Sequence, residues 1–370
     1  MGDDDAVAQL LDLARDIFGT PVAALARPGG DHPVVELTSS TLDPRATVRL
    51  LAGTDLAREA LSVEVRRPDG VPGGRLLGVP ASAAEPLDAR QVEALHVVAA
   101  LVAGVLHHRD RRSAEHRGRL ASLDALVAGR GRRTVLQPVV DLRSGAVVGA
   151  EALSRFTGED GYPRGPEQVF ADARDSGMGV RLERAALESA LTLLPALPAG
   201  AYLSVNASAE ALLDAATRQV LLASQPERVV VEVTEHHRVD DYAALVESTA
   251  ELRAEGLRLA VDDAGSGFAS LQHVLHLSPD VVKLDIAFVR GIDGDPARRA
   301  VARALVGFAS EVGATLVAEG VERPAELEVL RELEVDCAQG YLLGRPAPPP
   351  LRAVGGDDTT TIVLPRDPRP

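Results

Sequence analysis

Polar side chains follow one short apolar stretch after another from about residue 150 onward in this 370-residue chain. The stretches are rich in Val, Ile and Leu, as buried strands are. At or just past their ends lie residues that ligate cations or carry charge, namely Glu151, Asn206, Glu232, Glu235, Asp262, Asp263, Lys283, Glu319 and Gln339. If the strand ends meet at one place, several carboxylates share a pocket, and their mutual repulsion has to be relieved by bound cations.

Oxygen ligands of this kind select hard divalent cations. Mg²⁺ or Mn²⁺ fits them, whereas zinc would need His or Cys ligands. Two such ions close together activate a water and stabilise the attacking and leaving oxygens of a phosphate ester. The residue types therefore predict metal-assisted phosphodiester hydrolysis with two ions. Lys283 is the only lysine of the chain, and its compact ammonium suits orienting the water or screening an anionic transition state.

Each of these residues also has a simpler interpretation. A carboxylate or amide at a strand end commonly caps the following helix, and Asp262-Asp263 before Gly265 is compatible with a turn. Glu recurs on successive strands, however, although Ser and Asp are better helix caps. The recurrence favours one shared site.

The elements that must position these residues begin near Thr134. The expected strands are residues 135–140, 147–152, 202–205, 229–233, 257–261, 281–284, 315–318 and one near Tyr341. The expected helices between most of them are residues 209–222, 242–255, 296–312 and 324–333. Repeated strand–helix units over 134–346 predict an α/β fold, a closed TIM-type (β/α)8 barrel of parallel strands, which gathers catalytic groups at the strands' carboxyl ends. A doubly wound open sheet is the alternative.

The first part of the chain reads differently. Residues 1–108 predict a small α/β unit, with a helix near 5–17, short strands, a turn at 68–70 and a closing helix from Asp88; this order resembles a GAF sensory domain. Residues 109–133 predict an Arg-rich linking helix, either a solvated connector or a signal-transmitting helix that pairs with a second protomer. Residues 347–370 predict a disordered Pro-rich tail.

Composition excludes several classes of protein. Hydrophobic residues make up 46% and charged residues 25%, which is usual for packed domains. A net charge of −15 argues against DNA or RNA as a partner. The longest apolar run, 97–106, is too short to span a bilayer, and the Met-Gly-Asp-Asp-Asp start lacks the basic residues of a secretory signal. We therefore expect a cytoplasmic protein without membrane contact, with the single cysteine, Cys337, in the core.

Glu151-Ala152-Leu153 is the signature tripeptide of the EAL domain family, bacterial phosphodiesterases of cyclic di-GMP. The resemblance continues in family order through Leu136-Gln137-Pro138, Glu151 to Arg155, Ser204 to Asn206, Glu232 to Glu235, Asp262-Asp263, Lys283 to Asp285, Ala318 to Glu322 and Gln339 to Tyr341. It implies hydrolysis of cyclic di-GMP to linear pGpG. A non-catalytic receptor of the dinucleotide is the second hypothesis, although such receptors usually lack ligands that are all present here. An unrelated barrel enzyme acting on another phosphate ester is the third.

The resemblance also implies roles. The metal ligands would be Glu151, Asn206, Glu232, Asp262, Asp263 and Gln339. Gln339 would position a water or another metal ligand. Lys283 and Glu319 resemble the pair that handles the nucleophilic water, with Glu151 beside them as a catalytic residue. Substrate contacts would be Gln137, Arg155, Asp285 and Glu322. Glu235 resembles the anchor of the loop after Asp263, which the family uses to couple metal binding to dimerisation.

That loop departs from the family. Ala264 stands where an aromatic residue is common, and Ser266 stands where a Thr is common. The metal ligands are untouched, so activity is still expected. With Ala264 in place of an aromatic residue, we expect an under-packed loop and a low resting activity, and we expect formation of a homodimer to order the loop. The signal sensed by the N-terminal unit is not predicted.

Overall fold

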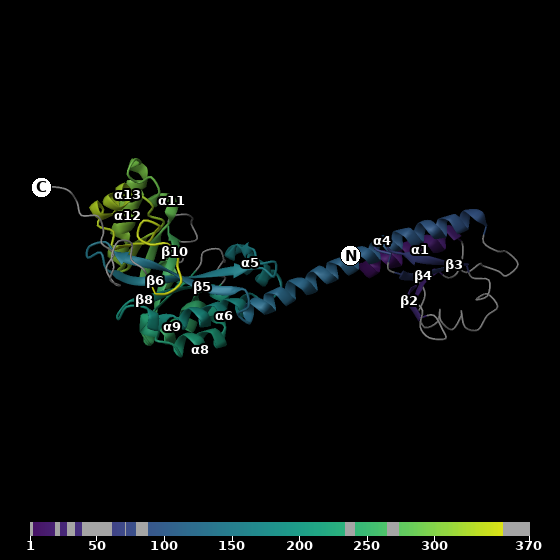
Figure 1. The fold of residues 1–370 in the computed structure, drawn as a ribbon, viewed down its shortest axis with the longest axis horizontal. Coiled ribbons are helices and arrows are strands. Elements are labelled where there is room, and N and C mark those ends of the chain that lie inside the picture. Colours follow the sequence, from purple (N-terminus) through teal and green to yellow (C-terminus); the bar gives the residue numbers. More distant parts are fainter. Residues whose placement is uncertain are drawn as a thin grey trace. The chain divides into compact units, whose positions relative to one another are not determined.

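The computed structural model describes residues 3–18, 23–27, 34–38, 61–70, 72–78, 88–233, 241–264 and 274–350. The chain forms two compact units, Met1–Arg119 and Leu120–Pro370 (Figure 1). The predicted linker is not a separate element, because helix α4 (Ala89–Val127) includes most of it. Ala347, one residue past the predicted end of the barrel at 346, forms an antiparallel bridge with Leu136. Residues 351–370 of the predicted tail lie outside the described residues.

The N-terminal unit has helix α1 (Asp3–Phe18) and a four-stranded antiparallel sheet in the order β2-β1-β4-β3. The strands are β1 (Ala23–Arg27), β2 (Val34–Thr38), β3 (Leu61–Arg66) and β4 (Pro72–Gly78). Its core joins Val7 and Leu11 of α1 to Val65, Leu76 and the first half of α4. The order of helix, antiparallel strands and closing helix agrees with the sequence, and the assignment to the GAF family stays a prediction.

Helix α4 contains an 18-residue stretch with a mean hydropathy of 1.5, so by length and composition it could cross a membrane. The longest unbroken apolar run is only 97–106, so the criterion of an unbroken run did not identify this longer stretch. About a third of the stretch is buried. Leu95, Val98, Val102 and Leu106 recur every three or four residues and form one face in the N-terminal core. Packing in the N-terminal core therefore accounts for the apolar character of these four residues.

The second unit is a closed barrel of mixed strands. Its ring is β5 (Arg132–Asp141), β13 (Cys337–Ala338), β12 (Thr315–Ala318), β11 (Val281–Leu284), β10 (Arg258–Ala264), β9 (Val229–Val233), β8 (Tyr202–Ala207) and β6 (Val147–Thr157), closed by β5–β6 pairing, with β7 (Pro163–Arg164) beside β6. The predicted all-parallel barrel is wrong at β5, which is antiparallel to β6 and β13. Only the turn at 142–146 joins β5 to β6, and a parallel connection needs about a dozen residues or more.

Helices around the strands complete this unit (Figure 1). They are α5 (Pro166–Asp175), α6 (Gly179–Leu191), α7 (Ala209–Leu213), α8 (Ala215–Leu222), α9 (Tyr242–Ala254), α11 (Ile286–Val289), α12 (Pro296–Val312) and α13 (Pro324–Glu332). The predicted helix 209–222 is divided at Asp214, whose side chain accepts a hydrogen bond from the Thr217 backbone N–H and caps α8. The predicted strand near Tyr341 is β13, which precedes that residue.

An apolar layer fills the barrel below the strand ends. It takes one residue from each of seven strands, namely Val139, Tyr202, Val230, Ala260, Val281, Val317 and Cys337. The prediction that Cys337 is a core residue is confirmed, and burial raises the pKa of its thiol to about 12. Side chains two positions apart on a strand share a face. The next inward-facing residue of each strand therefore lies directly above this layer.

Candidate functional site

The polar residues predicted at the strand ends form the layer above the apolar one. Moving two positions along each parallel strand from the apolar layer leads to Ser204, Glu232, Asp262, Lys283, Glu319 and Gln339. On the antiparallel β5 the step runs backwards, from Val139 to Gln137, which is paired with Glu151 of β6. Period-two alternation thus aims all of these side chains at the barrel axis.

Lys283 lies among four carboxylates. Its Nζ is 2.5 Å from Glu319 Oε1, 2.7 Å from Glu232 Oε2, 3.3 Å from Asp262 Oδ1 and 3.8 Å from Glu151 Oε2. The Lys283 side chain is only 4% exposed. One ammonium therefore faces four carboxylates, which leaves an excess of negative charge in a buried place.

The pKa values of these groups reflect burial first and the neighbouring charges second. Burial is the main cause that raises the pKa of Glu232 to about 8, against the pull of Lys283. Burial likewise raises the pKa of Glu319 well above its usual range. Burial alone would lower the pKa of Lys283, but the surrounding carboxylates raise it, so the ammonium stays charged. Further positive charge at this place would relieve the repulsion.

Amide and hydroxyl groups hold the carboxylates in place. Glu151 accepts hydrogen bonds from Asn206 Nδ2 at 3.1 Å and from Gln339 Nε2 at 2.6 Å. Ser204 Oγ donates to Glu232 Oε1 at 2.5 Å. Gln339 Nε2 also lies 3.0 Å from Gln137 Oε1, while the buried Gln339 Oε1 has no hydrogen-bond partner among the described residues. A buried amide oxygen of this kind can accept a ligand or a water.

The donor set fits a hard divalent cation. Carboxylate and amide oxygens, an excess of negative charge and the unpartnered Gln339 Oε1 are what Mg²⁺ or Mn²⁺ would use. Within the described part of the chain, no three His, Cys, Asp or Glu side chains are already arranged as metal ligands. The ammonium of Lys283 lies between the carboxylates instead.

A cavity of about 460 Å³ opens over this layer. Its lining joins residues predicted from the sequence with others, and consists of Gln137, Glu151, Leu153, Asp262, Lys283, Ile286, Arg290, Glu319, Gly320, Glu322, Gln339, Gly340 and Tyr341. Tyr341 is half exposed, and the guanidinium of Arg345 lies 4.4 Å from its ring centroid. The cavity thus has an acidic floor and an aromatic, partly cationic rim.

Some predicted site residues do not line the cavity of about 460 Å³. Arg155 and Asn206 line a neighbouring cavity of about 220 Å³, which shares Leu153 with the first. Asp285 caps α11, because its Oδ1 accepts a hydrogen bond from the Ala287 backbone N–H at 2.5 Å; it does not line either cavity. For Asp285 the structure therefore supports the capping interpretation. Glu235, the side chains of Asp263 and Ala264, and residues 265–273 with Ser266 fall outside what the structure describes.

Sequence reasoning missed Arg290 and Ile286 of the rim. Ile286 begins α11 and Arg290 follows its last residue. The rule that found the other residues looks for polar groups at strand ends, and neither residue is at one. Only their position over the barrel mouth brings them to the cavity.

The model of the EAL domain family matches residues 121–346, more than half of the chain. This chain belongs to the EAL domain family. The match begins before the predicted boundary at 134, because Leu123 and Leu126 of α4 pack with Phe156, Val169 and Leu182 of the barrel unit.

Three relatives illustrate the likeness. The cyclic di-GMP phosphodiesterase NbdA of Pseudomonas aeruginosa is 31% identical over 225 residues, which are 57% of this chain and 28% of NbdA. The MucR phosphodiesterase of the same organism, solved as a c-di-GMP complex, is 29% identical with a TM-score of 0.56, over 62% of this chain and 98% of the solved one. Bacillus subtilis YkuI, solved with its substrate c-di-GMP and calcium, is 22% identical with a TM-score of 0.54, over 64% of this chain and 60% of YkuI.

The YkuI likeness shows the fold alone. The chain spans 28% of the length of NbdA and 32% of full-length MucR.

Proposed function

We propose that the EAL barrel of this chain hydrolyses cyclic di-GMP to linear pGpG with two divalent cations. The observation that carries the proposal is the layer of carboxylates and amides around Lys283 at the floor of an open cavity. Membership in a family that is typically metal-dependent, and similarity to phosphodiesterases of this dinucleotide, support it. The cavity of about 460 Å³ lies within the usual size range of small-ligand pockets.

The residues divide the work by position. Glu151, Asn206, Glu232, Asp262, Asp263 and Gln339 would hold the cations. Such ions, when bound, activate a water and stabilise the charges that develop on the phosphate.

Lys283 supplies fixed positive charge beside the reacting oxygens, at a place where little water competes with it. Glu319 lies 2.5 Å from Lys283 and has a raised pKa, so its carboxylate is able to take up a proton near the attacking water. Gln137 and Glu322 line the cavity and would contact the dinucleotide, as would Arg155 from the neighbouring cavity.

The test is chromatography of the products formed from cyclic di-GMP with Mg²⁺ or Mn²⁺. Glu151→Ala should abolish pGpG formation, because it removes an oxygen ligand and the acceptor of two amide hydrogen bonds. The control is Glu188→Ala, which removes an exposed carboxylate of α6 outside both cavities. Thermal melting shows whether each variant is folded. Wild-type product formation in a folded Glu151→Ala variant would contradict the proposal.

A non-catalytic receptor is the second candidate. It is favoured by the ammonium of Lys283, which lies where cations would otherwise sit among the carboxylates. A receptor would bind cyclic di-GMP in a calorimetric titration and release no pGpG with either metal. Turnover of the bound dinucleotide would exclude it.

We further propose that the N-terminal unit is a GAF-like sensory domain that regulates the barrel of a cytoplasmic homodimer. Its helix–sheet–helix order and the continuous helix α4 support the idea. Activity per molecule should then rise with protein concentration. A constant specific activity across a dilution series in which light scattering shows dissociation would exclude coupling to dimerisation.

A further inference from the structure

The cavity over the barrel has few cations for an anionic substrate. Of its charged lining residues, four are carboxylates, namely Glu151, Asp262, Glu319 and Glu322, and two are cations, Lys283 and Arg290. Lys283 is already shared between buried carboxylates and is 4% exposed. Arg290 is different, because its side chain is 61% exposed at the rim.

Arg290 has donors to spare. One of its guanidinium nitrogens lies 2.7 Å from Glu322 Oε1, and the Glu322 side chain is itself 41% exposed. A guanidinium carries five N–H donors in a planar fork that fits two phosphate oxygens. Ion pairs this exposed contribute little stability, so the Arg290–Glu322 pair can open towards a ligand.

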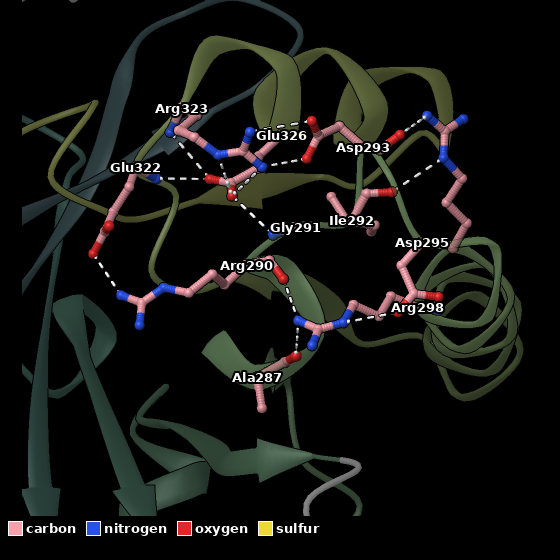
Figure 2. Close-up of polar contacts among 11 residues, drawn as sticks. Ala287, Arg290, Gly291, Ile292, Asp293, Asp295, Arg298, Glu322, Arg323 and Glu326 are labelled. Carbon is pink, nitrogen blue, oxygen red and sulfur yellow. Dashed lines mark hydrogen bonds and ion pairs between the residues drawn. The ribbon is translucent and has the colours of Figure 1, made fainter.

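The backbone beneath this pair is held by one buried carboxylate. Glu326 of α13 is 1% exposed and accepts hydrogen bonds from the Gly291 N–H at 2.9 Å and the Glu322 N–H at 3.1 Å. Gly291 directly follows Arg290, so Glu326 is hydrogen-bonded to both of the loops that carry the Arg290–Glu322 ion pair. Figure 2 shows Glu326 between these loops, with the Arg290 side chain extended towards Glu322.

Two arginines reinforce the arrangement. Arg323 donates to Glu326 from its backbone N–H and from Nε, both at 3.0 Å. Arg298 donates to the carbonyl oxygen of Arg290, and also to that of Ala287 at 2.7 Å (Figure 2). The carbonyl oxygen of Arg290 and the N–H of Gly291 are therefore both hydrogen-bonded. These bonds hold the backbone and leave the exposed side chain of Arg290 free to turn.

We propose that Arg290 binds an anionic phosphate oxygen of the substrate at the cavity rim, and that Glu326 is the positioning residue that holds Arg290 and Glu322 there. The proposal rests on the proposed function and adds a substrate contact that lies outside the strand-end residues. An anion that approaches four carboxylates needs an accessible cation on its way in, and among the described lining residues Arg290 is the accessible one.

The experiment uses the full chain and steady-state hydrolysis of cyclic di-GMP. Arg290→Ala should raise KM about tenfold, the usual effect of one charge-assisted hydrogen bond, with little change in kcat. Arg290→Lys should recover part of the loss, because it restores charge without the fork. The matched control is Arg181→Ala, since Arg181 is 55% exposed and pairs with Asp124 away from both cavities. An unchanged KM in Arg290→Ala would overturn the proposal.

A double-mutant cycle separates direct contact from support of Glu322. If Arg290 touches the substrate, Arg290→Ala raises KM in the Glu322→Ala background as well. If Arg290 only orients Glu322, the second substitution has no further effect, and the proposed contact is wrong.

Glu326→Gln tests the positioning role. The amide keeps the shape of the side chain but one of its two acceptors becomes a donor. Because Glu326 holds the loops of both Arg290 and Glu322, KM should rise in the otherwise wild-type chain and should not rise further in the Arg290→Ala/Glu322→Ala background, while thermal melting reports any loss of fold. An equal rise in both backgrounds would mean that Glu326 acts elsewhere.

Binding measurements separate this inference from the proposed function. The probes are cyclic di-GMP with Ca²⁺, by calorimetry, and inorganic phosphate, by phosphorus NMR. Binding of phosphate that depends on Arg290, without binding of cyclic di-GMP, would support the anion contact and overturn the proposed function. Equal binding of both probes by wild type and Arg290→Ala would overturn the anion contact alone.

Discussion

At the scale of single residues, Lys283 shows how the site uses chemistry that other residues of the chain do not provide. Its ammonium reaches four carboxylates within 3.8 Å from a side chain that is almost fully buried. A guanidinium is planar and wider, and it cannot place its charge at the same point. The lone lysine in an arginine-rich chain is therefore explained by the geometry of the layer around it.

Lys283→Arg should lower kcat about a hundredfold, because the wider guanidinium keeps the charge but moves it from its preorganised position, and removing one preorganised group typically has an effect of that size. Hydrolysis assays at saturating cyclic di-GMP measure the change, and thermal melting separates it from unfolding. Near-normal kcat in this variant would show that Lys283 is only a structural cation.

At the scale of elements, the β5–β6 hairpin is what makes the barrel mixed rather than parallel. Asp141 shapes the turn, since its Oδ1 accepts hydrogen bonds from the N–H and the hydroxyl of Ser144, both at 2.6 Å. The hairpin sets Gln137 opposite Glu151. A turn of a few residues thus determines which polar side chains meet across the two strands.

Asp141→Ala should lower the free energy of unfolding by about 1 kcal/mol at neutral pH, as loss of these hydrogen bonds to a partly exposed carboxylate implies. The hydrogen bonds from Ser144 lower the pKa of Asp141 below its usual 3.8. Its contribution is therefore present above that value and is lost as the pH falls through the lower folded pKa. Urea unfolding of wild type and variant should give stabilities that converge in acid, and a gap independent of pH would contradict this account.

At the scale of the whole molecule, the boundary of the barrel unit lies inside α4. The last turns of α4 belong to the barrel, because Leu123 and Leu126 are buried against Phe156, Val169 and Leu182. The first half of the same helix belongs to the N-terminal core. One helix therefore contributes side chains to two cores. A fragment that lacks part of α4 loses the core residues that this part supplies.

A fragment of residues 120–350 should fold and bind cyclic di-GMP, whereas the fragment 134–346 should be less stable by at least about 2 kcal/mol, the low end for losing one buried leucine. Urea unfolding measures the difference. Leu123→Ala in the longer fragment should reproduce part of it. Equal stability of the two fragments would return the boundary to residue 134.

The sequence alone predicted most strands and the residues that end them. Runs of branched apolar residues form the buried strands of a barrel. Because side chains alternate between the two faces of a strand, the inward-facing residue that follows each run lies at the strand end. This is why residue types and their spacing are enough to assign Glu232, Asp262 and Lys283 to one site. Capping explains why the expected helix at 296–312 coincides with α12. Asp295 is its N-cap and accepts hydrogen bonds from the N–H groups of Ala297 and Arg298, and Pro296 occupies the first helical position.

Only the tertiary structure decided how these pieces meet. The cap at Asp285 depends on a backbone direction that a pattern of residue types does not encode. The antiparallel β5, by contrast, follows from the expected strands 135–140 and 147–152, because the segment between them is too short for a parallel connection. Arg290 lines the cavity although it is far in sequence from most of the other lining residues, and the neighbouring Gly291 N–H donates to Glu326 of a helix further along the chain. Local sequence determines which face of a strand is buried, whereas contacts between distant segments determine which loops close over that face.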